Sequence, residues 1–308
     1  MLKIGKGGWM MSSENVGFLK AFPILFRSRL EAIFIWSWLT TIICLVLGRG
    51  FPPLWPTLFT VLSMILLSMS TYVYNDITDM EMDAHNEIKG KRPLPSKRVS
   101  VSDAKKVSVV TGVLGLATSY LVSTYGFIFA SLYTLVLIGY SHPITRFKKR
   151  FLLNELFYFT CFPFVGLMVC YALEGRVVMP AMFAAIIFGS FITPMKPLFG
   201  DSTDMYEDKL FGMRHLGVVL SWKGKIQLMI VTLLFIMTIT PLTYVQLGFN
   251  VVVPIMVVAM SLGFLRIMFP IMNDYDTAMV LRAKKFAHIY FFLLQIVLIV
   301  GTINLGFL

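Results

Sequence analysis

Charged residues are scarce in this chain, at 14% of its 308 residues. A soluble domain of this length carries about 25% charged residues. Cysteine and histidine are scarcer still, with three and four residues, and neither recurs at metal-ligand spacing. The shortage of charge therefore excludes a soluble globular domain, and the positions of His and Cys argue against a zinc or copper site.

Apolar residues fill the place of the missing charge, at 57% of the chain with a mean hydropathy of +0.78. Apolar stretches near the ~20 residues needed to cross a bilayer recur along the whole length. They lie near 30–48, 54–75, 107–123, 126–141, 151–173, 178–199, 226–248, 250–272 and 286–307. No linker or low-complexity tract separates them. We therefore predict one all-α membrane domain over residues 1–308, with nine transmembrane helices.

The basic residues are distributed unevenly between the two predicted membrane faces. Long or basic loops follow the second, fourth, sixth and eighth segments, whereas the other connections are short and neutral. All but Arg49 and Arg176 of the 27 lysines and arginines lie nearer the N-terminal face. The positive-inside rule predicts a multi-pass cell membrane protein with a cytoplasmic N-terminus and an external C-terminus. The net charge of +11 then reflects topology and contact with anionic headgroups, which disfavours nucleic-acid binding.

Two acidic runs, 75–83 and 201–208, follow the second and sixth segments on that same face. At about 100° per residue, the ligands of each run fall within an arc of roughly 60° to 80° on one helix face. Crowded carboxylates at the end of a membrane helix require a cation, and oxygen ligands suit Mg²⁺. The predicted metal ligands are Asn75, Asp79, Asp83, Asp201, Asp204 and Asp208. The predicted catalytic residues are Asp76, Asp79, Asp204 and Asp208.

Basic residues follow both acidic runs closely in sequence. Divalent cations together with Arg and Lys neutralise diphosphates, and an apolar chain suits a ligand with a hydrocarbon tail. We therefore predict a prenyl diphosphate as substrate. The predicted diphosphate-binding residues are Lys91, Arg92, Arg146, Lys148 and Lys209. Topology alone accounts for most of the lysines, and we expect His85, His142, His215 and His288 at interfaces without a catalytic role.

The run Asn75–Asp83 fits the signature NDxxDxxxD, and the chain resembles the UbiA superfamily of intramembrane prenyltransferases. Arg92–Ser96 is similar to the family's RPLPSG segment. Tyr140-Ser141 with the basic run 146–150 is similar to its YS…K segment, which adds Tyr140 to the candidate site. Asp201–Asp208 resembles the second DxxDxxxD motif, and Gly212 stands where the family has a following glycine. The resemblance covers roughly residues 20–305.

The resemblance implies nine helices around a central cavity with a cytoplasmic cap. It also implies two Mg²⁺ ions that bridge the clusters to the substrate diphosphate. Asn75, Asp79, Asp204 and Asp208 match the metal-binding pairs. Two positions depart from the family. Lys97 stands where the family usually has glycine after Ser96, and we expect it to change how the cap loop bends and to add a charge. Lys196-Pro197 stands where many members have Arg-Glu, which leaves the acceptor class open.

The predicted reaction is Mg²⁺-dependent transfer of a prenyl group, through an allylic cation, from a polyprenyl diphosphate such as geranylgeranyl diphosphate to a lipophilic acceptor. Basic residues near the cytoplasmic mouth favour a phosphorylated acceptor such as geranylgeranylglyceryl phosphate; a quinone precursor, a phosphosugar and haem are alternatives. An intramembrane terpene cyclase would use the same ionisation without an acceptor. A transporter is disfavoured because its ionisable residues would lie near the bilayer midplane.

Overall fold

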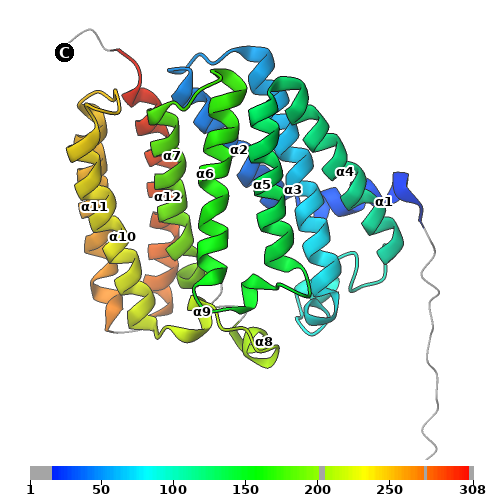
Figure 1. Cartoon of the computed structure of the whole chain (residues 1–308). Helices are drawn as coiled ribbons and strands as arrows, with labels where there is room; N and C mark the ends of the chain where they lie inside the picture. Colours follow the sequence, from blue (N-terminus) through cyan, green and yellow to red (C-terminus); the bar gives the residue numbers. More distant parts are fainter. Residues whose placement is uncertain (1–15, 201–204, 274–275, 305–308) are drawn as a thin grey trace, which may run out of the picture.

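The computed structural model describes residues 16–200, 205–273 and 276–304, whose regular structure is helical throughout (Figure 1). The helices of 17 residues or more in these ranges are α2 (Leu30–Leu47), α3 (Leu54–Asp83), α4 (Val101–Val122), α5 (Thr124–Ser141), α6 (Leu153–Leu173), α7 (Met179–Met195), α10 (Trp222–Thr243), α11 (Val252–Met268) and α12 (Thr277–Gly301). The shorter helices and turns are α1 (Phe18–Ser28), η1 (Lys89–Lys91), η2 (Phe147–Lys149), η3 (Lys196–Gly200), α8 (Met205–Leu210), α9 (Leu216–Val219) and η4 (Pro270–Met272).

Each of the nine predicted segments overlaps one long helix, and the largest boundary shifts are at α3, α4 and α12, the last of which begins at Thr277 rather than near residue 286. Helix α3 continues past residue 75 to Asp83, so the whole first acidic run is helical. Helix α4 begins at Val101, ahead of its apolar run, because Ser100 caps it: the Ser100 hydroxyl oxygen accepts a hydrogen bond from the Asp103 N–H at 3.0 Å. The helical geometry assumed for the first acidic run is confirmed.

Among the described residues, seven helices are long and apolar enough to cross a membrane: α2, α3, α5, α6, α7 with its following turn, α10 and α12. Helix α11 is apolar and has 17 residues. Helix α4 falls outside the seven because charged residues occupy its first turns and Ser, Thr and Gly occupy its packed face. The sequence-based count of nine crossings therefore has seven clear members and two shorter or more polar helices.

The polar composition of α4 serves its contact with α3. Ser70 and Ser108 exchange hydrogen bonds, each hydroxyl donating to the other residue's carbonyl at 2.7 and 2.9 Å. A Cβ at Gly115 would lie 2.9 Å from the Leu67 side chain, so the glycine allows the two helices to approach closely. Small residues and interhelical hydrogen bonds drive helix association in lipid. For this reason α4 is not among the seven helices that are long and apolar enough to cross a membrane.

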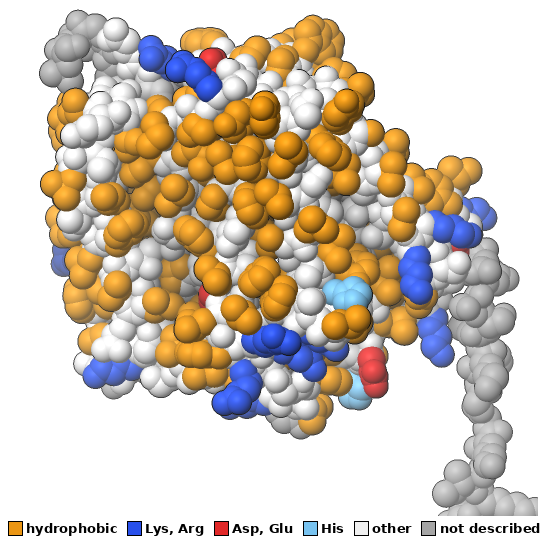
Figure 2. Space-filling view, viewed as in Figure 1, with side chains coloured by type: hydrophobic (Ala, Val, Ile, Leu, Met, Phe, Trp, Pro, Cys, Tyr) orange, Lys and Arg blue, Asp and Glu red, His pale blue; other side chains and the backbone are white. Residues whose placement is uncertain are grey.

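Apolar side chains also cover the outside of the helix bundle. Figure 2 shows hydrophobic atoms spread over the middle of the visible face, with Lys and Arg side chains toward its edges. Exposed large apolar residues include Val113, Leu121, Leu135, Phe235 and Leu242, which lie on three different helices. Soluble monomers do not expose apolar surface on this scale. Together with the long apolar helices, this surface identifies an integral membrane protein.

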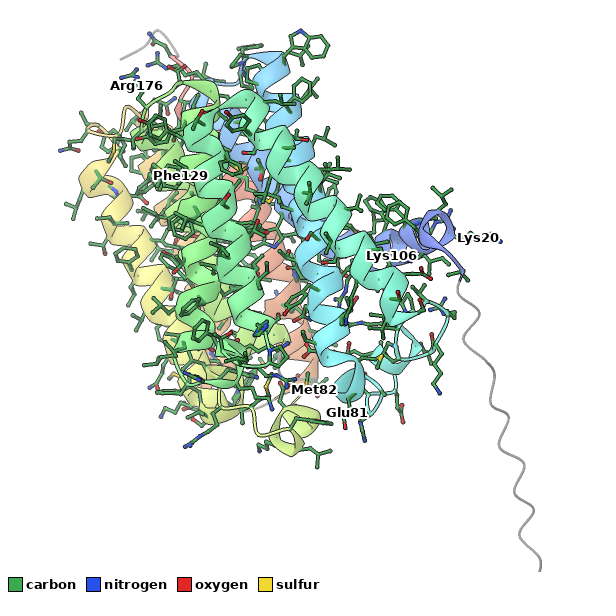
Figure 3. All side chains as sticks on the ribbon, turned by 45° about the vertical axis from the view of Figure 1, so that its right-hand side comes forward. Lys20, Glu81, Met82, Lys106, Phe129 and Arg176 are labelled. Atoms are coloured by element: carbon green, nitrogen blue, oxygen red, sulfur yellow. The ribbon has the colours of Figure 1, made fainter. Side chains whose placement is uncertain are left out.

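The connections that carry the acidic runs lie at one end of the bundle. Figure 1 places α8 and α9 at the same end as the C-terminus of α3 and the start of α6. In Figure 3, Glu81 and Met82 lie at this end, whereas Arg176 lies at the opposite end. Arg49 and Arg176 line a second cavity of about 350 Å³ there, together with the α10–α11 connection. The first acidic run and the described part of the second, from Met205, therefore lie at the same end of the bundle.

Candidate active site

A cavity of about 400 Å³ opens at the end of the bundle where α3 terminates. Its polar lining comes from segments far apart in the sequence: Asn75, Asp79 and Asp83 on α3, Arg29, Lys89, Arg92, Tyr140, Ser141, Lys148, Asn154, Lys196, Asp208 and His215. Thr71, Tyr72, Met82, Leu137, Tyr158 and Met213 complete the wall. Cationic, anionic and aromatic groups therefore meet in one half-enclosed space.

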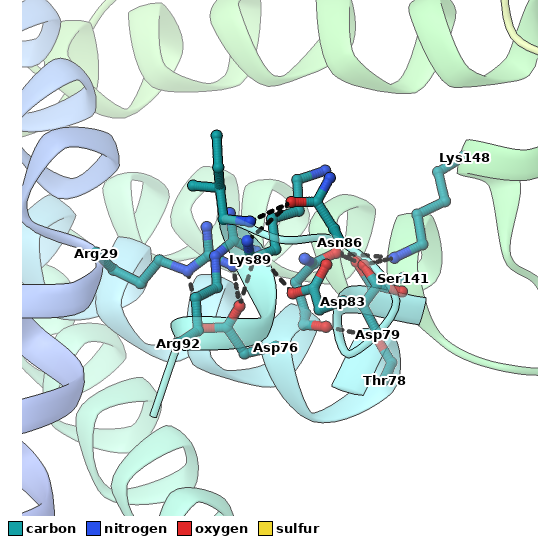
Figure 4. A network of polar contacts seen from close by, with 12 residues as sticks. Arg29, Asp76, Thr78, Asp79, Asp83, Asn86, Lys89, Arg92, Ser141 and Lys148 are labelled. Carbon is teal, nitrogen blue, oxygen red and sulfur yellow. Dashed lines mark hydrogen bonds and ion pairs between the residues drawn. The ribbon is translucent and has the colours of Figure 1, made fainter. Parts of the chain in front are cut away.

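Helix α3 presents the first ligand set. Asn75, Asp79 and Asp83 are four residues apart, so they lie one above the other on the helix face that lines the cavity. Asp79 and Asp83 expose only 5% and 3% of their surface. Buried carboxylates require a paired charge. Figure 4 shows Lys148 and Arg92, from the connections after α5 and α3, bonded to these two carboxylates.

Lys148, which follows α5 in the turn η2, binds two of these ligands at once. Its ammonium donates to Asp79 Oδ2 at 2.5 Å and to Asn75 Oδ1 at 2.9 Å (Figure 4). Ser141 Oγ donates to the same Asn75 oxygen at 2.7 Å. Burial lowers the pKa of Lys148 from its usual value, and the neighbouring Asp79 carboxylate acts in the opposite direction. A cation is therefore held where the oxygen atoms of Asn75 and Asp79 converge.

Arg92 joins the loop after α3 to the third ligand. Its Nη1 lies 2.7 Å from Asp83 Oδ2 and 3.7 Å from Asp76 Oδ1. The loop turns back at Lys97, whose φ of +59° lies in the left-handed region. This is the position where the resemblance anticipates glycine, and a side chain there costs about 1–2 kcal/mol. Lys97 therefore adopts a backbone conformation that favours glycine.

Asp76 lies outside the cavity, unlike the other members of the first run. It is 2% exposed, and Arg29, at the junction of α1 and α2, binds it through both Nε and Nη2 (Figure 4). At about 100° per residue, Asp76 lies just beyond the arc shared by Asn75, Asp79 and Asp83, where it meets Arg29. The structure therefore gives the predicted catalytic residue Asp76 a place in an ion pair that fastens α1 and α2 to α3.

We expect Asp76→Asn to lower stability more than it lowers turnover per folded molecule, because it leaves the Arg29 guanidinium buried without a counter-charge. Breaking a buried pair in this way costs about 3–5 kcal/mol. The apparent melting temperature in detergent and the specific activity of the monodisperse fraction measure the two effects. A loss of turnover above 100-fold with an unchanged melting temperature would show that Asp76 acts in the chemistry.

The second acidic run is described from Met205 onward, and Asp208 is the predicted ligand within the described part. Predicted ligands Asp201 and Asp204 lie outside the described residues. Pro197 lies in the π-helical turn η3 after α7. Asp208 lies on the separate short helix α8 and not on an extension of α7. Gly212 ends this segment with φ +69°, a left-handed conformation that glycine adopts without strain. Asp208 is 6% exposed and lines the cavity.

His215 is the partner of Asp208. The Gly217 N–H donates to His215 Nδ1 at 3.1 Å, so the proton resides on Nε2, which donates to Asp208 Oδ2 at 3.0 Å. The ring is 4% exposed and lines the cavity. Sequence reasoning placed this histidine at an interface without a role at the site. The spacing of seven residues from Asp208, across a glycine turn, carries no regular helical signal.

We expect His215→Ala to reduce turnover about 10- to 100-fold, because loss of a residue that orients a ligand typically has an effect of this size. Asp208 would keep its charge but lose the hydrogen bond that orients it. Steady-state kinetics of the purified variant measure the change, with His288→Ala as a control at an exposed position on α12. Equal activity of the two variants would show that His215 only caps α9.

Contacts between the loops hold the two motifs around the cavity. The Arg214 N–H donates to the Lys149 carbonyl at 2.9 Å, and Lys149 Nζ donates to the Phe211 carbonyl at 2.9 Å. The rings of His85 and Phe211 meet at 5.3 Å, edge to face. The connection after α3, the connection after α5 and the segment after α8 therefore contact one another.

The remaining predicted residues differ in their position relative to the cavity. Tyr140 lines the cavity, and its hydroxyl donates to Asn154 Oδ1 at 2.6 Å. Arg146 reaches Asp79 Oδ1 from outside the wall, with Nη2 at 3.4 Å. Lys91 and Lys209 are exposed and lie outside the cavity. Arg29, Lys89, Asn154, Lys196 and His215 also line the cavity, and sequence reasoning did not select them.

The donor set fits a hard divalent cation. Asn75, Asp79, Asp83 and Asp208 bring oxygen ligands from both motifs to the wall of one cavity, which is the chemistry that Mg²⁺ prefers. Within the described ranges, no three His, Cys, Asp or Glu side chains converge closely enough to enclose an ion by themselves. This arrangement suits Mg²⁺, which is usually held by one or two carboxylates together with phosphate oxygens and water.

Comparison with known proteins connects this arrangement to a family. Residues 37–298 match the model of the UbiA prenyltransferase family. Digeranylgeranylglyceryl phosphate synthase of Sulfolobus acidocaldarius is 29% identical over 242 residues, which are 78% of this chain and 83% of that protein. A solved structure concerning digeranylgeranylglyceryl phosphate synthase has a TM-score of 0.73 at 23% identity, covering 93% of this chain and 99% of the other. A UbiA homologue from Archaeoglobus fulgidus bound to GPP and Mg²⁺ has a TM-score of 0.64 at 16% identity, covering 88% and 99%.

Proposed function

The chain belongs to the UbiA prenyltransferase family and is a prenyltransferase, and on this premise we propose that it transfers a geranylgeranyl group to the free hydroxyl of geranylgeranylglyceryl phosphate. The observation that carries the proposal is the convergence of Asn75, Asp79, Asp83 and Asp208 with basic side chains on one cavity of a membrane-embedded helix bundle. The relatives named as digeranylgeranylglyceryl phosphate synthases support the choice of acceptor.

In the proposed reaction, the C1–O bond of the prenyl diphosphate breaks heterolytically, and the electron pair leaves with the diphosphate. Asn75, Asp79, Asp83, Asp204 and Asp208 would hold Mg²⁺, with Asp201 as a further ligand. We propose that two Mg²⁺ ions bind there. They would supply electrostatic stabilisation of the leaving diphosphate. The cavity-lining cations Lys89, Arg92 and Lys148 would bind the remaining diphosphate oxygens.

The cavity wall would protect the allylic cation and place the acceptor. Tyr72, Leu137 and Tyr158 line the cavity beside the charged residues and limit access of water to C1. The acceptor hydroxyl oxygen attacks C1 and forms a new C–O bond, while its proton passes to the departing diphosphate. Holding the two substrates next to each other supplies much of the rate.

Product analysis tests the proposal. Purified protein is incubated with geranylgeranyl diphosphate and Mg²⁺, with and without geranylgeranylglyceryl phosphate, and lipids are identified by mass spectrometry. We expect the diether phosphate only when both substrates are present. A cyclic hydrocarbon formed without acceptor would indicate a terpene cyclase, and unchanged diphosphate with every acceptor class would contradict prenyl transfer.

We further propose the membrane arrangement that the charge distribution indicates. One domain of nine crossing helices would carry its N-terminus and both acidic motifs on the cytoplasmic side, under a cap formed by the connections after α3 and α7. The placement of the basic connections at one end of the bundle supports this orientation. Single cysteines introduced at Lys97 and Arg176, in a variant lacking Cys44, Cys161 and Cys170, should react from opposite sides of sealed vesicles. Labelling of both positions from one side would contradict it.

A further inference from the structure

Lys196 brings a further cation to the cavity from the end of α7. It is the first residue after α7, in the wide turn η3, and its side chain is half-buried in the lining. Its Nζ donates to the Tyr140 hydroxyl oxygen at 2.9 Å. The same atom lies 5.5 Å from the centre of the Tyr140 ring and 5.2 Å from that of Tyr158. Single π-helical turns such as η3 are frequent at functional sites.

The end of α5 separates this ammonium from the first acidic motif. Tyr140 and Ser141 are adjacent, yet they bond in different directions. Tyr140 accepts from Lys196, whereas Ser141 donates to Asn75 Oδ1 at 2.7 Å. Lys148 is bound to the oxygens of Asn75 and Asp79 on the α3 side. The cavity therefore has two cationic regions, one among the motif carboxylates and one on a tyrosine pair.

A chain of hydrogen bonds fixes the direction of the Lys196–Tyr140 contact. The Tyr140 hydroxyl donates its proton to Asn154 Oδ1 at 2.6 Å, so it acts toward Lys196 as an acceptor. Asn154 Nδ2 donates to Glu155 Oε1 at 2.9 Å, and the same oxygen accepts from the Leu216 N–H at 2.8 Å. Asn154 and Glu155 are 2% and 7% exposed. This buried chain holds Tyr140 in place beneath the lysine.

The two regions correspond to two anionic groups of the proposed substrates. In the proposed function the diphosphate lies beside the motif carboxylates, where Arg92 and Lys148 also line the cavity. We propose that Lys196 binds the phosphate monoester of the acceptor, with Tyr140 as the positioning residue that fixes its ammonium. This inference rests on the proposed prenyl transfer and deepens it by assigning recognition of the acceptor headgroup. A lysine provides a point charge with three donors, which suits a monoester.

Two acceptors that differ only in the phosphate test the assignment: geranylgeranylglyceryl phosphate and the corresponding unphosphorylated alcohol. We expect Lys196→Gln to lower kcat/KM for the phosphorylated acceptor by on the order of 10- to 100-fold, the effect of one charge-assisted hydrogen bond. The value for the alcohol should stay within about threefold, and Lys196→Arg should restore most of the lost activity. Lys223→Gln, at an exposed position on α10, is the matched control and should resemble wild type.

Equal losses for both acceptors, or a raised KM for geranylgeranyl diphosphate, would assign Lys196 to the diphosphate and overturn the inference. No loss for either acceptor would also overturn it. Direct binding of the two acceptors to wild type and to Lys196→Gln, measured by calorimetry in detergent, separates this inference from the reaction. If wild type forms no product, the proposed function fails. Even then, if Lys196→Gln loses the preference of wild type for binding the phosphorylated lipid, the binding of that lipid's phosphate at Lys196 is still supported. Identical binding preferences in the two proteins would remove that support.

Discussion

Replacing Asp79 with asparagine is expected to reduce prenyl transfer by about 10³-fold or more, the scale seen when a group that stabilises developing charge is removed. Asp79 lies in the middle of the α3 ligand column and lines the cavity. Its two oxygens accept from Lys148 at 2.5 Å and from Arg146 at 3.4 Å. The substitution keeps the shape of the side chain and removes its charge.

The variant should remain folded, because Lys148 also binds Asn75 Oδ1 and an asparagine oxygen at position 79 can still accept from it. Size-exclusion profiles and thermal unfolding in detergent check this point before activity is compared. Glu81→Gln is the matched control, since Glu81 is on the same turn of α3 but exposed (Figure 3). Asp208→Asn provides an independent test from the second motif. Retained Mg²⁺-dependent activity in both motif variants would refute the assignment of the site.

Removing divalent cations is expected to have an effect at least as large. With excess EDTA, product formation should fall below detection, and added Mg²⁺ should restore it. The described ligands are all oxygen atoms, and the buried carboxylates Asp79, Asp83 and Asp208 surround the cavity where the diphosphate would bind. Without a metal, these negative charges would repel a diphosphate.

The control for chelation is a readout that does not depend on turnover. The melting temperature of the protein should fall little with EDTA, because Lys148, Arg92 and His215 are bonded to the carboxylates in the structure. A rise in melting temperature on adding geranylgeranyl diphosphate should require Mg²⁺. Full activity in the presence of excess chelator would exclude the metal role that the donor set indicates.

The contrast between Asp76 and Asp79 shows where sequence reasoning was sufficient and where it was not. Helical periodicity placed Asn75, Asp79 and Asp83 on one arc and Asp76 just beyond it, and α3 has this geometry. Periodicity did not identify Arg29 as the partner of Asp76, because Arg29 precedes Asp76 by 47 positions and lies at the junction of α1 and α2. The selection of Asp76 as catalytic rested on motif membership, and its side chain lies outside the cavity wall.

The second motif also has features that sequence reasoning did not predict. Its spacing of acidic residues suggested a continuous helix end, but Pro197 lies in a wide turn and Asp208 belongs to the separate helix α8. His215 received no role from the sequence because no regular repeat relates it to Asp208. The left-handed Gly212 between them reverses the chain and brings the imidazole back to the carboxylate.

The sequence by itself determined the class of protein, the helical segments, the common face of the acidic motifs and the family resemblance. These depend on composition and on the 3.6-residue repeat, which are local properties of the chain. Only the tertiary structure decided which cation meets which carboxylate, that Asp76 secures α1 and α2, and that Lys196 lies on Tyr140 and Tyr158. Those contacts join residues 38 to 69 positions apart, or lie across irregular turns. Their geometry depends on how helices pack and loops close, which no local pattern encodes.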